Sequence, residues 1–313
     1  MTSHFRRDAL FLIAGPCVLE SDALNIRVAE HLARLAEHVP GGIVFKASFD
    51  KANRSNADAH RGPGLDHGLA ALDRVRRATG LPILTDVHLP EQCAPAAQVV
   101  DVLQIPAFLC RQTDLLVAAG NTGKAVNVKK GQWMHPDGMR GAVDKVRQSR
   151  RASRESRIAN REAVTERGSF FGYGDLVVDM RGFMRMRAAR PAKERGNDSV
   201  AVTERGTFFG YGDLVVDMRS FARLRAACDA PIVFDATHSV QRPGQGAAGA
   251  SGGAREFIPS LTLAAMAAGA DGLFMETHPD PDHAPSDGPN MIPLDQLDDL
   301  VMRAVDIWHR VSA

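Results

Sequence analysis

The feature that most constrains the fold is a regular alternation of short apolar, β-branched runs with longer amphipathic stretches along the chain. Helical periodicity is clearest at residues 24–39, 65–78, 221–228 within a longer helix, 258–268 and 294–311. The strand-like runs are eight in number, at residues 11–17, 43–49, 82–88, 99–107, 126–131, 200–206, 231–238 and 272–279. Parallel crossovers join strands that alternate with helices, and closing the strands into a cylinder removes their exposed edges. The pattern therefore predicts an α/β chain folded as a (β/α)8 TIM barrel.

An open, doubly wound sheet is the alternative arrangement for the same alternation. A G-x-G-x-x-G turn after a strand would favour it, and no such turn follows any of the eight runs. The length of 313 residues suits a single barrel domain over residues 1–313. The hydrophobic fraction of 44% and the charged fraction of 24% are ordinary for a globular protein.

Charge and cysteine content narrow the class of partner and the compartment. A formal net charge of +1 provides no strong overall field for nucleic acid or anionic lipid. No apolar run is long enough for a membrane span or a signal peptide. The arginine-rich stretch at residues 150–157 lacks an accompanying set of aromatic residues, so we expect no nucleic-acid partner and no membrane. Four widely separated cysteines do not resemble a disulfide framework and favour a cytoplasmic protein.

Nearly every strand-like run finishes in polar and titratable residues or is followed by them. They are Cys17; Lys46, Lys51 and Arg54; Asp86 and His88; Gln104 and Arg111; Lys129 and Lys130; Glu204 and Arg205; Asp235 and His238; Glu276 and His278. One polar residue at the end of a strand is common by chance, but the recurrence is not. Because the carboxyl ends of parallel barrel strands meet on one face, we predict that these residues converge on an active site there.

Four of these strand ends and following loops carry possible metal ligands, namely Cys17, His238, Glu276 and Asp287. Thiolate, imidazole and carboxylate together suit a borderline divalent ion such as Mn, Zn, Fe or Co. Taken singly, each residue has a structural explanation; a free cysteine in a Gly-Pro turn, for example, is usually a small buried hydrophobe. No compact C-x-x-C or H-E-x-x-H signature supports the set.

The second group is cationic and comprises Lys46, Lys51, Arg54, Arg111, Lys129 and Arg205. Lysine recognises phosphate and carboxylate as a point charge and arginine as a bidentate fork. One or two such residues would be ordinary surface cations. Lys46 and Lys129, however, follow buried strand residues and are expected to point into the barrel mouth, where an unpaired cation would require an anion. The group therefore predicts one or two substrates with several negative charges.

A local duplication interrupts the regular spacing. Residues 164–188 read VTERGSFFGYGDLVVDMRGFMRMRA and residues 202–226 read VTERGTFFGYGDLVVDMRSFARLRA, an offset of 38 residues from Val164 to Val202. Two copies are too few for a solenoid. We assign the second copy to the sixth strand because apolar residues 200–202 lead into it, whereas polar residues 160–162 precede the first. Residues from about 147 to 194 then form an insert between the fifth helix and the sixth strand, opposite the catalytic face.

Eight long motifs, in order, give the chain a specific resemblance. They are IAGPCVLES, FKASFDKANRS, LTDVH, DVLQIPAFLCRQTDLL, VNVKKGQ, TERGTFFGYGDLVVDM, FDATHSVQ and METHPDPDHAPSDGPNMIPL. Together they resemble the 3-deoxy-D-manno-octulosonate-8-phosphate synthases over almost the whole chain outside the insert. The resemblance implies a homotetramer of TIM barrels. It also implies condensation of phosphoenolpyruvate, D-arabinose 5-phosphate and water to the eight-carbon acid phosphate and inorganic phosphate, for lipopolysaccharide biosynthesis.

The same resemblance assigns roles to individual residues. Cys17, rather than asparagine, follows AGP, which implies the metal-dependent branch, with His238, Glu276 and Asp287 completing the ligand set. The implied catalytic residues are Lys46, Lys51, His238 and Asp287. The implied substrate-binding residues are Gln104, Lys129 and Arg205 for phosphoenolpyruvate, with Lys46 and Lys51 nearby; Asn53, Arg54 and Ser55 for the pentose phosphate; Asp86 for a sugar hydroxyl; and Arg111 for the sugar phosphate of a neighbouring subunit. The spacing from TERG to FDATH suits only the second copy, so Arg205 is assigned rather than Arg167.

Two alternatives remain open at this point. The related 3-deoxy-D-arabino-heptulosonate-7-phosphate synthases use erythrose 4-phosphate and share AGPC, but their substrate loop usually reads KPRTS, whereas residues 51–55 here read KANRS. The second alternative is a catalytically impaired barrel, because two near-identical segments compete for one position in the fold.

Overall fold

The computed structural model describes residues 4–52, 60–155, 169–171, 175–177, 199–208, 214–242 and 252–312. Eight parallel strands close into a barrel in the order β1-β2-β3-β4-β5-β8-β11-β14, and β14 pairs back to β1. The strands are β1 (Phe11–Gly15), β2 (Ile43–Lys46), β3 (Ile83–Asp86), β4 (Val102–Ile105), β5 (Ala125–Lys129), β8 (Val200–Glu204), β11 (Ile232–Asp235) and β14 (Gly272–His278). The predicted (β/α)8 TIM barrel is therefore confirmed.

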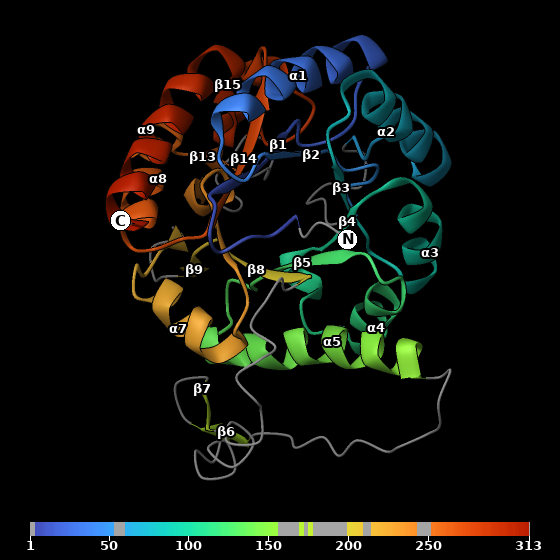
Figure 1. The fold of residues 1–313 in the computed structure, drawn as a ribbon, viewed down its shortest axis with the longest axis vertical. Coiled ribbons are helices and arrows are strands. Elements are labelled where there is room, and N and C mark those ends of the chain that lie inside the picture. The colour runs from blue at the N-terminus through green and yellow to red at the C-terminus, as the bar shows by residue number, and fades with distance from the viewer. Residues whose placement is uncertain are drawn as a thin grey trace.

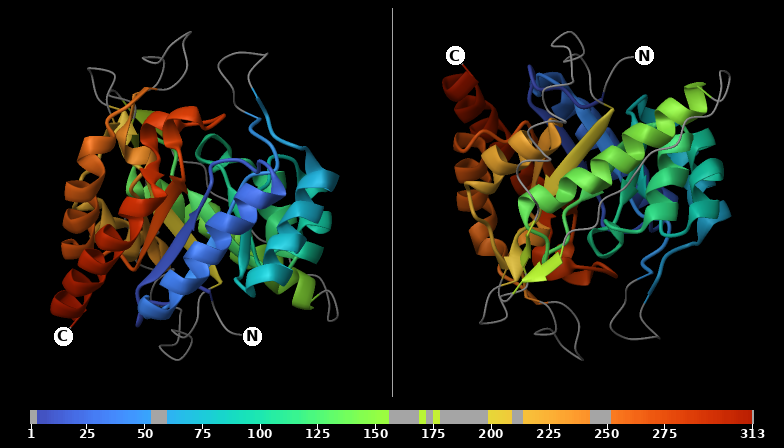
Figure 2. Two further views of the ribbon diagram at one scale, coloured as in Figure 1. Left: turned by 90° about the horizontal axis from the view of Figure 1, so that it is seen from above. Right: turned by 90° about the horizontal axis from the view of Figure 1, so that it is seen from below.

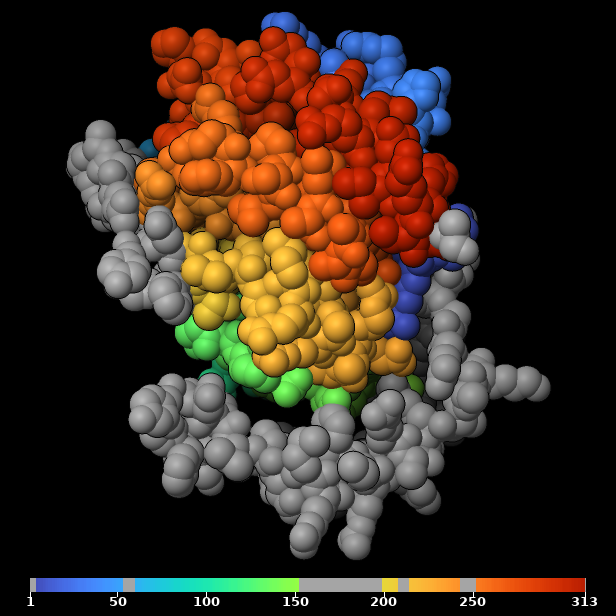
Figure 3. Space-filling view, turned by 90° about the vertical axis from the view of Figure 1, so that its left-hand side faces the viewer, coloured from blue at the N-terminus to red at the C-terminus, as the bar shows by residue number. Residues whose placement is uncertain are grey.

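Helices surround the strands in chain order, running clockwise in Figure 1 from α1 at the top through α5 at the bottom to α9. Figure 2 shows the same helices outside the strands from two further directions, and in Figure 3 the segments coloured yellow to red cover one flank. The helices are α1 (Asp22–Leu35), α2 (Leu65–Thr79), α3 (Pro90–Val99), α4 (Thr113–Asn121), α5 (Arg140–Glu155), α7 (Ser220–Cys228), α8 (Ile258–Ala267) and α9 (Leu294–Ser312). None of the helices in the described ranges offers a stretch long and apolar enough to cross a bilayer.

Alternation along each strand divides the core into two layers. In β1, Leu12 and Ala14 belong to the large cluster between strands and helices, whereas Phe11 and Ile13 belong to a smaller cluster inside the barrel. This follows from the two-residue period of a strand, which sends successive side chains to opposite faces. Phe5 packs against this inner cluster beside Phe11, the first residue of β1, and the centroids of the two rings lie 5.5 Å apart.

Three sequence expectations about element bounds are corrected. The helix expected to extend beyond residues 221–228 is the nine-residue α7, because Asp229 adopts a left-handed conformation (φ 46°) and ends it. The helix expected at residues 24–39 ends as α1 at Leu35 and continues as a 3-10 turn, Ala36–His38. The fourth strand was expected to begin at Val99, which instead is the last residue of α3.

The sixth barrel strand is β8, which comes from the run leading into the second copy of the duplication. It pairs in parallel with β5 on one side and β11 on the other. In the first copy, β6 (Ser169–Phe171) and β7 (Asp175–Val177) pair with each other and not with the barrel. The other residues between 156 and 198 lie outside the described part of the chain.

Candidate active site

The inner face of the barrel changes from apolar to polar at one level. Most strands carry an apolar inward residue and, two positions later, a polar one on the same face. The apolar level contains Val44, Leu84, Val102, Ala201, Val233 and Phe274. The polar level contains Lys46, Asp86, Gln104, Asn127, Thr203, Asp235 and Glu276, all of them buried. This polar level forms the floor of the mouth at the carboxyl ends of the strands, where active sites of this fold lie.

A continuous chain of hydrogen bonds crosses half of this floor. Thr203 donates its hydroxyl to Asn127 Oδ1 (2.8 Å), Asn127 donates its amide to Gln104 Oε1 (2.7 Å), and Gln104 donates to Asp86 Oδ1 (2.8 Å). Ser48 donates to the other oxygen of Asp86. Each amide is satisfied on both sides, which fixes its orientation. The floor is therefore rigid before any substrate binds.

Three of the four predicted metal ligands form one compact group at the mouth. The ligand atoms of Cys17, Glu276 and Asp287 all lie within 4.8 Å of one another. Cys17 Sγ donates to Asp287 Oδ2 at 3.1 Å and contacts Ser286 Oγ at the same distance, and Ser286 Oγ donates to Asp287 Oδ2 at 2.8 Å. Gln241 donates to the other carboxylate oxygen, Asp287 Oδ1, at 2.9 Å.

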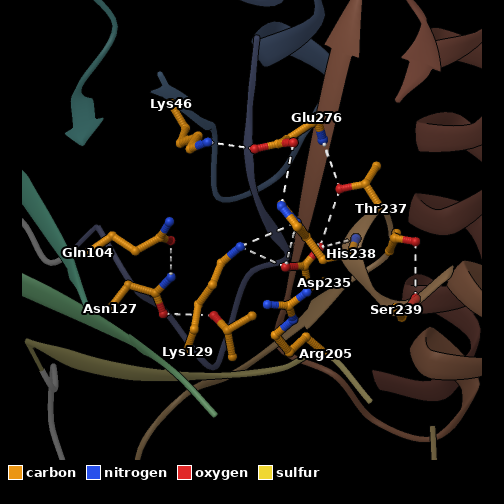
Figure 4. Close-up of polar contacts among 12 residues, drawn as sticks. Lys46, Gln104, Asn127, Lys129, Arg205, Asp235, Thr237, His238, Ser239 and Glu276 are labelled. Carbon is orange, nitrogen blue, oxygen red and sulfur yellow. Dashed lines mark hydrogen bonds and ion pairs between the residues drawn. The ribbon is translucent and has the colours of Figure 1, made fainter. Parts of the chain in front are cut away.

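His238, the fourth predicted ligand, lies against this group. Its Nε2 is 3.5 Å from Glu276 Oε2, and its Nδ1 faces Asp235 Oδ2 at 3.0 Å (Figure 4). Glu276 Oε2 is buried and makes no hydrogen bond to any described residue. Two ligands of a tetrahedral ion with bonds of about 2.1 Å lie about 3.4 Å apart. The separation and the free carboxylate oxygen therefore fit a divalent ion held by these side chains.

Local backbone geometry brings the ligands together. Gly15 has a φ of 155°, and a Cβ there would lie 2.1 Å from the carbonyl oxygen of Lys46, so only glycine permits β1 to approach β2 as it turns toward Cys17. Asp287 adopts a left-handed φ of 52°, which is unusual for a residue other than glycine. Such strained conformations concentrate at functional sites.

Burial and neighbouring charges shift the pKa values of the ligand set in opposite directions. Burial, reinforced by Glu276, raises the pKa of the Cys17 thiol far above its usual range. Burial alone would also raise the pKa of the Glu276 carboxyl, but Lys46 and His238 outweigh it and hold that pKa at about 2. For the pKa of Asp287, burial acts upward and is outweighed by His238 and Lys51, so the net shift is downward. The carboxylates are therefore ionised, and the thiol keeps its proton until a cation replaces it.

Four of the six predicted cations, Lys46, Lys51, Lys129 and Arg205, lie at the same mouth. Lys46 and Lys129, which were expected to require an anion there, are paired with carboxylates of the protein itself. Lys46 Nζ donates to Glu276 Oε1 at 2.6 Å, and Lys129 Nζ donates to Asp235 Oδ2 at 2.7 Å (Figure 4). Lys51 Nζ lies 3.9 Å from Glu276 Oε1. A buried lysine requires a counter-ion, and the strand-end carboxylates supply it here.

Two of these cations still carry features of an anion site. Burial lowers the pKa of Lys129 despite Asp235, and its Nζ lies 3.7 Å from the centroid of the Phe274 ring. One terminal guanidinium N–H of Arg205 donates a hydrogen bond to Gln241 Oε1 at 2.6 Å, while the buried Nε of Arg205 makes no hydrogen bond to the described residues. An arginine with a buried free donor beside a second cation is suited to a phosphate or carboxylate.

Not every predicted residue joins this group. Arg111 is exposed beyond the 3-10 turn Ala107–Leu109. Asn53, Arg54 and Ser55 lie outside the described residues.

Some functional neighbours were missed by sequence reasoning. Asn127 and Thr203 complete the polar floor beside Asp235, which the sequence had already placed among the converging residues without a role, and Ser286 and Gln241 contact Asp287. Asn127 and Thr203 could have been found by counting two residues on from each inward apolar position. Ser286 and Gln241 belong to loops, whose approach no periodicity encodes.

Comparison with known proteins gives a consistent result over almost the whole chain. Residues 5–308 match the DAHP synthetase I family. A 2-dehydro-3-deoxyphosphooctonate aldolase from Syntrophotalea carbinolica is 48% identical over 297 residues, covering 94% of this chain and 90% of the relative. Proteins of the same name from Trichlorobacter lovleyi (48% over 294 residues; 94% and 90%) and Desulfotalea psychrophila (46% over 303 residues; 97% and 91%) are similar. The chain therefore belongs to the DAHP synthetase I family.

Proposed function

We propose that this chain is a 3-deoxy-8-phosphooctulonate synthase, a carbon-carbon bond-forming transferase. It condenses phosphoenolpyruvate with D-arabinose 5-phosphate and water to 3-deoxy-D-manno-octulosonate 8-phosphate and inorganic phosphate, for lipopolysaccharide biosynthesis. Identity of 48% across 94% of the chain to a 2-dehydro-3-deoxyphosphooctonate aldolase supports this assignment most strongly. The adjacent ligand group and cations at the barrel mouth support it independently.

The proposal includes a divalent metal, held by Cys17, His238, Glu276 and Asp287. A mixed set of thiolate, imidazole and carboxylates favours Mn, Zn, Fe or Co over magnesium or calcium. When bound, such an ion supplies a Lewis acid and an orienting template to the reacting oxygens. A cysteine at position 17 supports, by resemblance, membership of the metal-dependent branch of these synthases.

The protein's own residues would bind and orient the two substrates. Lys129 and Arg205 bind the phosphate of phosphoenolpyruvate, while Lys46, Lys51 and Gln104 surround the rest of that molecule. C3 of phosphoenolpyruvate forms the new bond to the aldehyde carbon of the sugar, water adds at C2, and inorganic phosphate leaves. The cations are fixed in place before the reaction, so they stabilise developing negative charge without reorganising.

For the sugar, Asp86 binds a hydroxyl, and Asn53, Arg54 and Ser55 bind the phosphate end. Arg111 is exposed on a single subunit and would reach the sugar phosphate of a neighbouring subunit, within a homotetramer. The site is therefore complete only in the assembled protein.

The test is an assay of phosphate release from phosphoenolpyruvate and arabinose 5-phosphate, with and without added divalent ion. We expect a strong chelator to abolish turnover and Mn²⁺ or Zn²⁺ to restore part of it, because the ligand set would then lack its ion. Full activity in the metal-free protein would refute the requirement for a metal. An absence of activity under every condition would refute the assignment as a synthase.

The same assay with erythrose 4-phosphate separates the two sugar specificities. We expect arabinose 5-phosphate to be the better substrate, since residues 51–55 read KANRS rather than KPRTS. A preference for the four-carbon sugar would instead assign the chain to the heptulosonate branch.

A further inference from the structure

Asp235, the last residue of β11, is completely buried and has no role in the metal or substrate set above. Its two carboxylate oxygens make five contacts with three residues. Oδ1 accepts from the backbone nitrogen of His238 at 2.8 Å and lies 3.1 Å from His238 Nδ1, while Thr237 donates to it at 3.3 Å. Oδ2 accepts from Lys129 Nζ at 2.7 Å and lies 3.0 Å from His238 Nδ1. Asp235 therefore lies at the centre of the contacts drawn in Figure 4.

These contacts decide where His238 carries its proton. Nδ1 lies 3.0 and 3.1 Å from the two oxygens of Asp235, both acceptors, so a proton on Nδ1 makes a hydrogen bond there. The competing arrangement would have Nδ1 accept from Lys129 Nζ, at 3.4 Å. That contact is longer, and Lys129 already donates to Asp235. The geometry favours the tautomer with hydrogen on Nδ1.

When the ring is neutral, as a metal ligand must be, a proton on Nδ1 leaves Nε2 with a free lone pair. Nε2 then faces Glu276 Oε2 at 3.5 Å, another acceptor with no hydrogen bond to the described residues. Two acceptors that face each other in a buried site repel unless a cation lies between them. The tautomer set by Asp235 is thus the one that a metal ion requires.

Asp235 is also connected to Glu276, through Thr237. Thr237 donates its hydroxyl to Asp235 Oδ1, and the same hydroxyl oxygen accepts from the backbone nitrogen of Glu276 at 3.2 Å. The ligand-bearing ends of β11 and β14 are therefore joined through one aspartate and one threonine.

We propose that Asp235 is a positioning residue, which holds His238 with its Nε2 free for the metal and, through Thr237, fixes the main chain at Glu276. The inference rests on the metal site of the proposed function. Groups that orient a metal-bound histidine typically contribute about 10–100-fold in metal affinity. Asp235 acts in this proposal through His238 and Thr237, not as a ligand of the ion.

The experiment compares Asp235→Asn with the wild type and with Asp271→Asn as a matched control. Asp271 is also a buried aspartate bonded to β11, but at the opposite end of the barrel, where it accepts from the backbone nitrogen of Ile232 at 2.8 Å and from Arg225. We expect Asp235→Asn to lower Zn²⁺ affinity, measured by competition with a chelator, by about 10–100-fold. Asp271→Asn keeps the wild-type affinity even if it lowers thermal stability.

A second measurement needs no variant. The ¹⁵N NMR signals of His238 in the metal-free wild type report which ring nitrogen is protonated, and we expect the proton on Nδ1. A proton on Nε2 alone, or equal Zn²⁺ affinity of Asp235→Asn and the wild type, would overturn the positioning role. If the wild type binds no divalent ion, the metal site of the proposed function is refuted, and this inference is refuted with it.

Discussion

Glu276 divides its two carboxylate oxygens between different neighbours. Oε1 accepts from Lys46 at 2.6 Å and Oε2 faces His238 at 3.5 Å, so one buried side chain forms an ion pair and keeps its other oxygen free of hydrogen bonds to the described residues. The sequence identified Glu276, Lys46 and His238 because each lies toward the end of a strand-like run. It did not reveal that Lys46 is neutralised within the protein, since that depends on which strands become neighbours across the barrel.

The low pKa of Glu276 gives a pH prediction for the metal-free protein. The folded-state pKa of about 2 lies below the ordinary value of 4.5, so the ionised carboxylate contributes stability above pH 4.5 that is lost as the pH falls toward 2. At pH 7 we expect the free energy of unfolding of the wild type to exceed that of Glu276→Gln by on the order of 3 kcal/mol. Denaturant titrations at pH 7, 5 and 3 measure this difference. It should narrow with decreasing pH, and a constant difference would contradict the assignment of the shift to this carboxyl.

Behind β5 and β8, a second ion pair supports the loops that carry the cations. Lys130 Nζ lies 3.3 Å from Glu204 Oε1 in the layer between strands and helices, and both side chains are buried. Lys130 also donates to the carbonyl oxygens of Gly131 and Met134, and Glu204 Oε1 accepts from the backbone nitrogen of Gly206. The sequence neighbours Lys129 and Arg205 face the opposite side, into the mouth. Charged residues that are neighbours in the sequence thus point to opposite faces of the barrel wall.

Removing one partner of this pair should be more harmful than removing both charges. We expect Lys130→Met to lower the free energy of unfolding by about 3–5 kcal/mol, because Glu204 is left buried and unpaired. The double variant Lys130→Met, Glu204→Gln should recover part of that loss, since glutamine can still accept from the Gly206 nitrogen. Chemical denaturation of the two single variants and the double variant measures the coupling, and purely additive losses would contradict it.

The elements themselves were largely predictable from the sequence. All eight strands form where the apolar runs predicted them, although each strand is shorter than its run. α3 and α4 were harder to identify, because α3 contains Pro95 and α4 has nine residues. The loop residues Ser286 and Gln241 could not be predicted, since tertiary packing alone brings them to Asp287.

At the scale of the whole molecule, the duplication leaves the barrel closed. β5 and β8 pair directly, with Val126 opposite Val200 and Lys129 opposite Thr203, although the chain between α5 and β8 carries the extra copy. This connection enters β8 at its amino end, away from the mouth. The geometry therefore argues against the impaired-barrel alternative, and the deletion below tests it.

Deleting residues 157–194 removes 38 residues, the offset of the repeat, and joins α5 to the run before β8. We expect the deletion variant to keep the barrel and the wild-type turnover, with an equal or higher melting temperature, because β8 loses none of its strand partners. Circular dichroism melting and the phosphate-release assay measure both properties. A large gain in activity would instead favour a chain damaged by its own duplication.

The pairing of β8 with both of its neighbours has a consequence for the history of this gene. The start of the second copy belongs to β8, which pairs with barrel strands on two sides, whereas β6 and β7 of the earlier copy pair only with each other among the described residues. Selection for folding and turnover thus acts unequally on two sister segments that still differ at few positions. In descendants that retain both segments, mutations should accumulate first in residues 164–188, while Thr203, Glu204 and Arg205 stay unchanged.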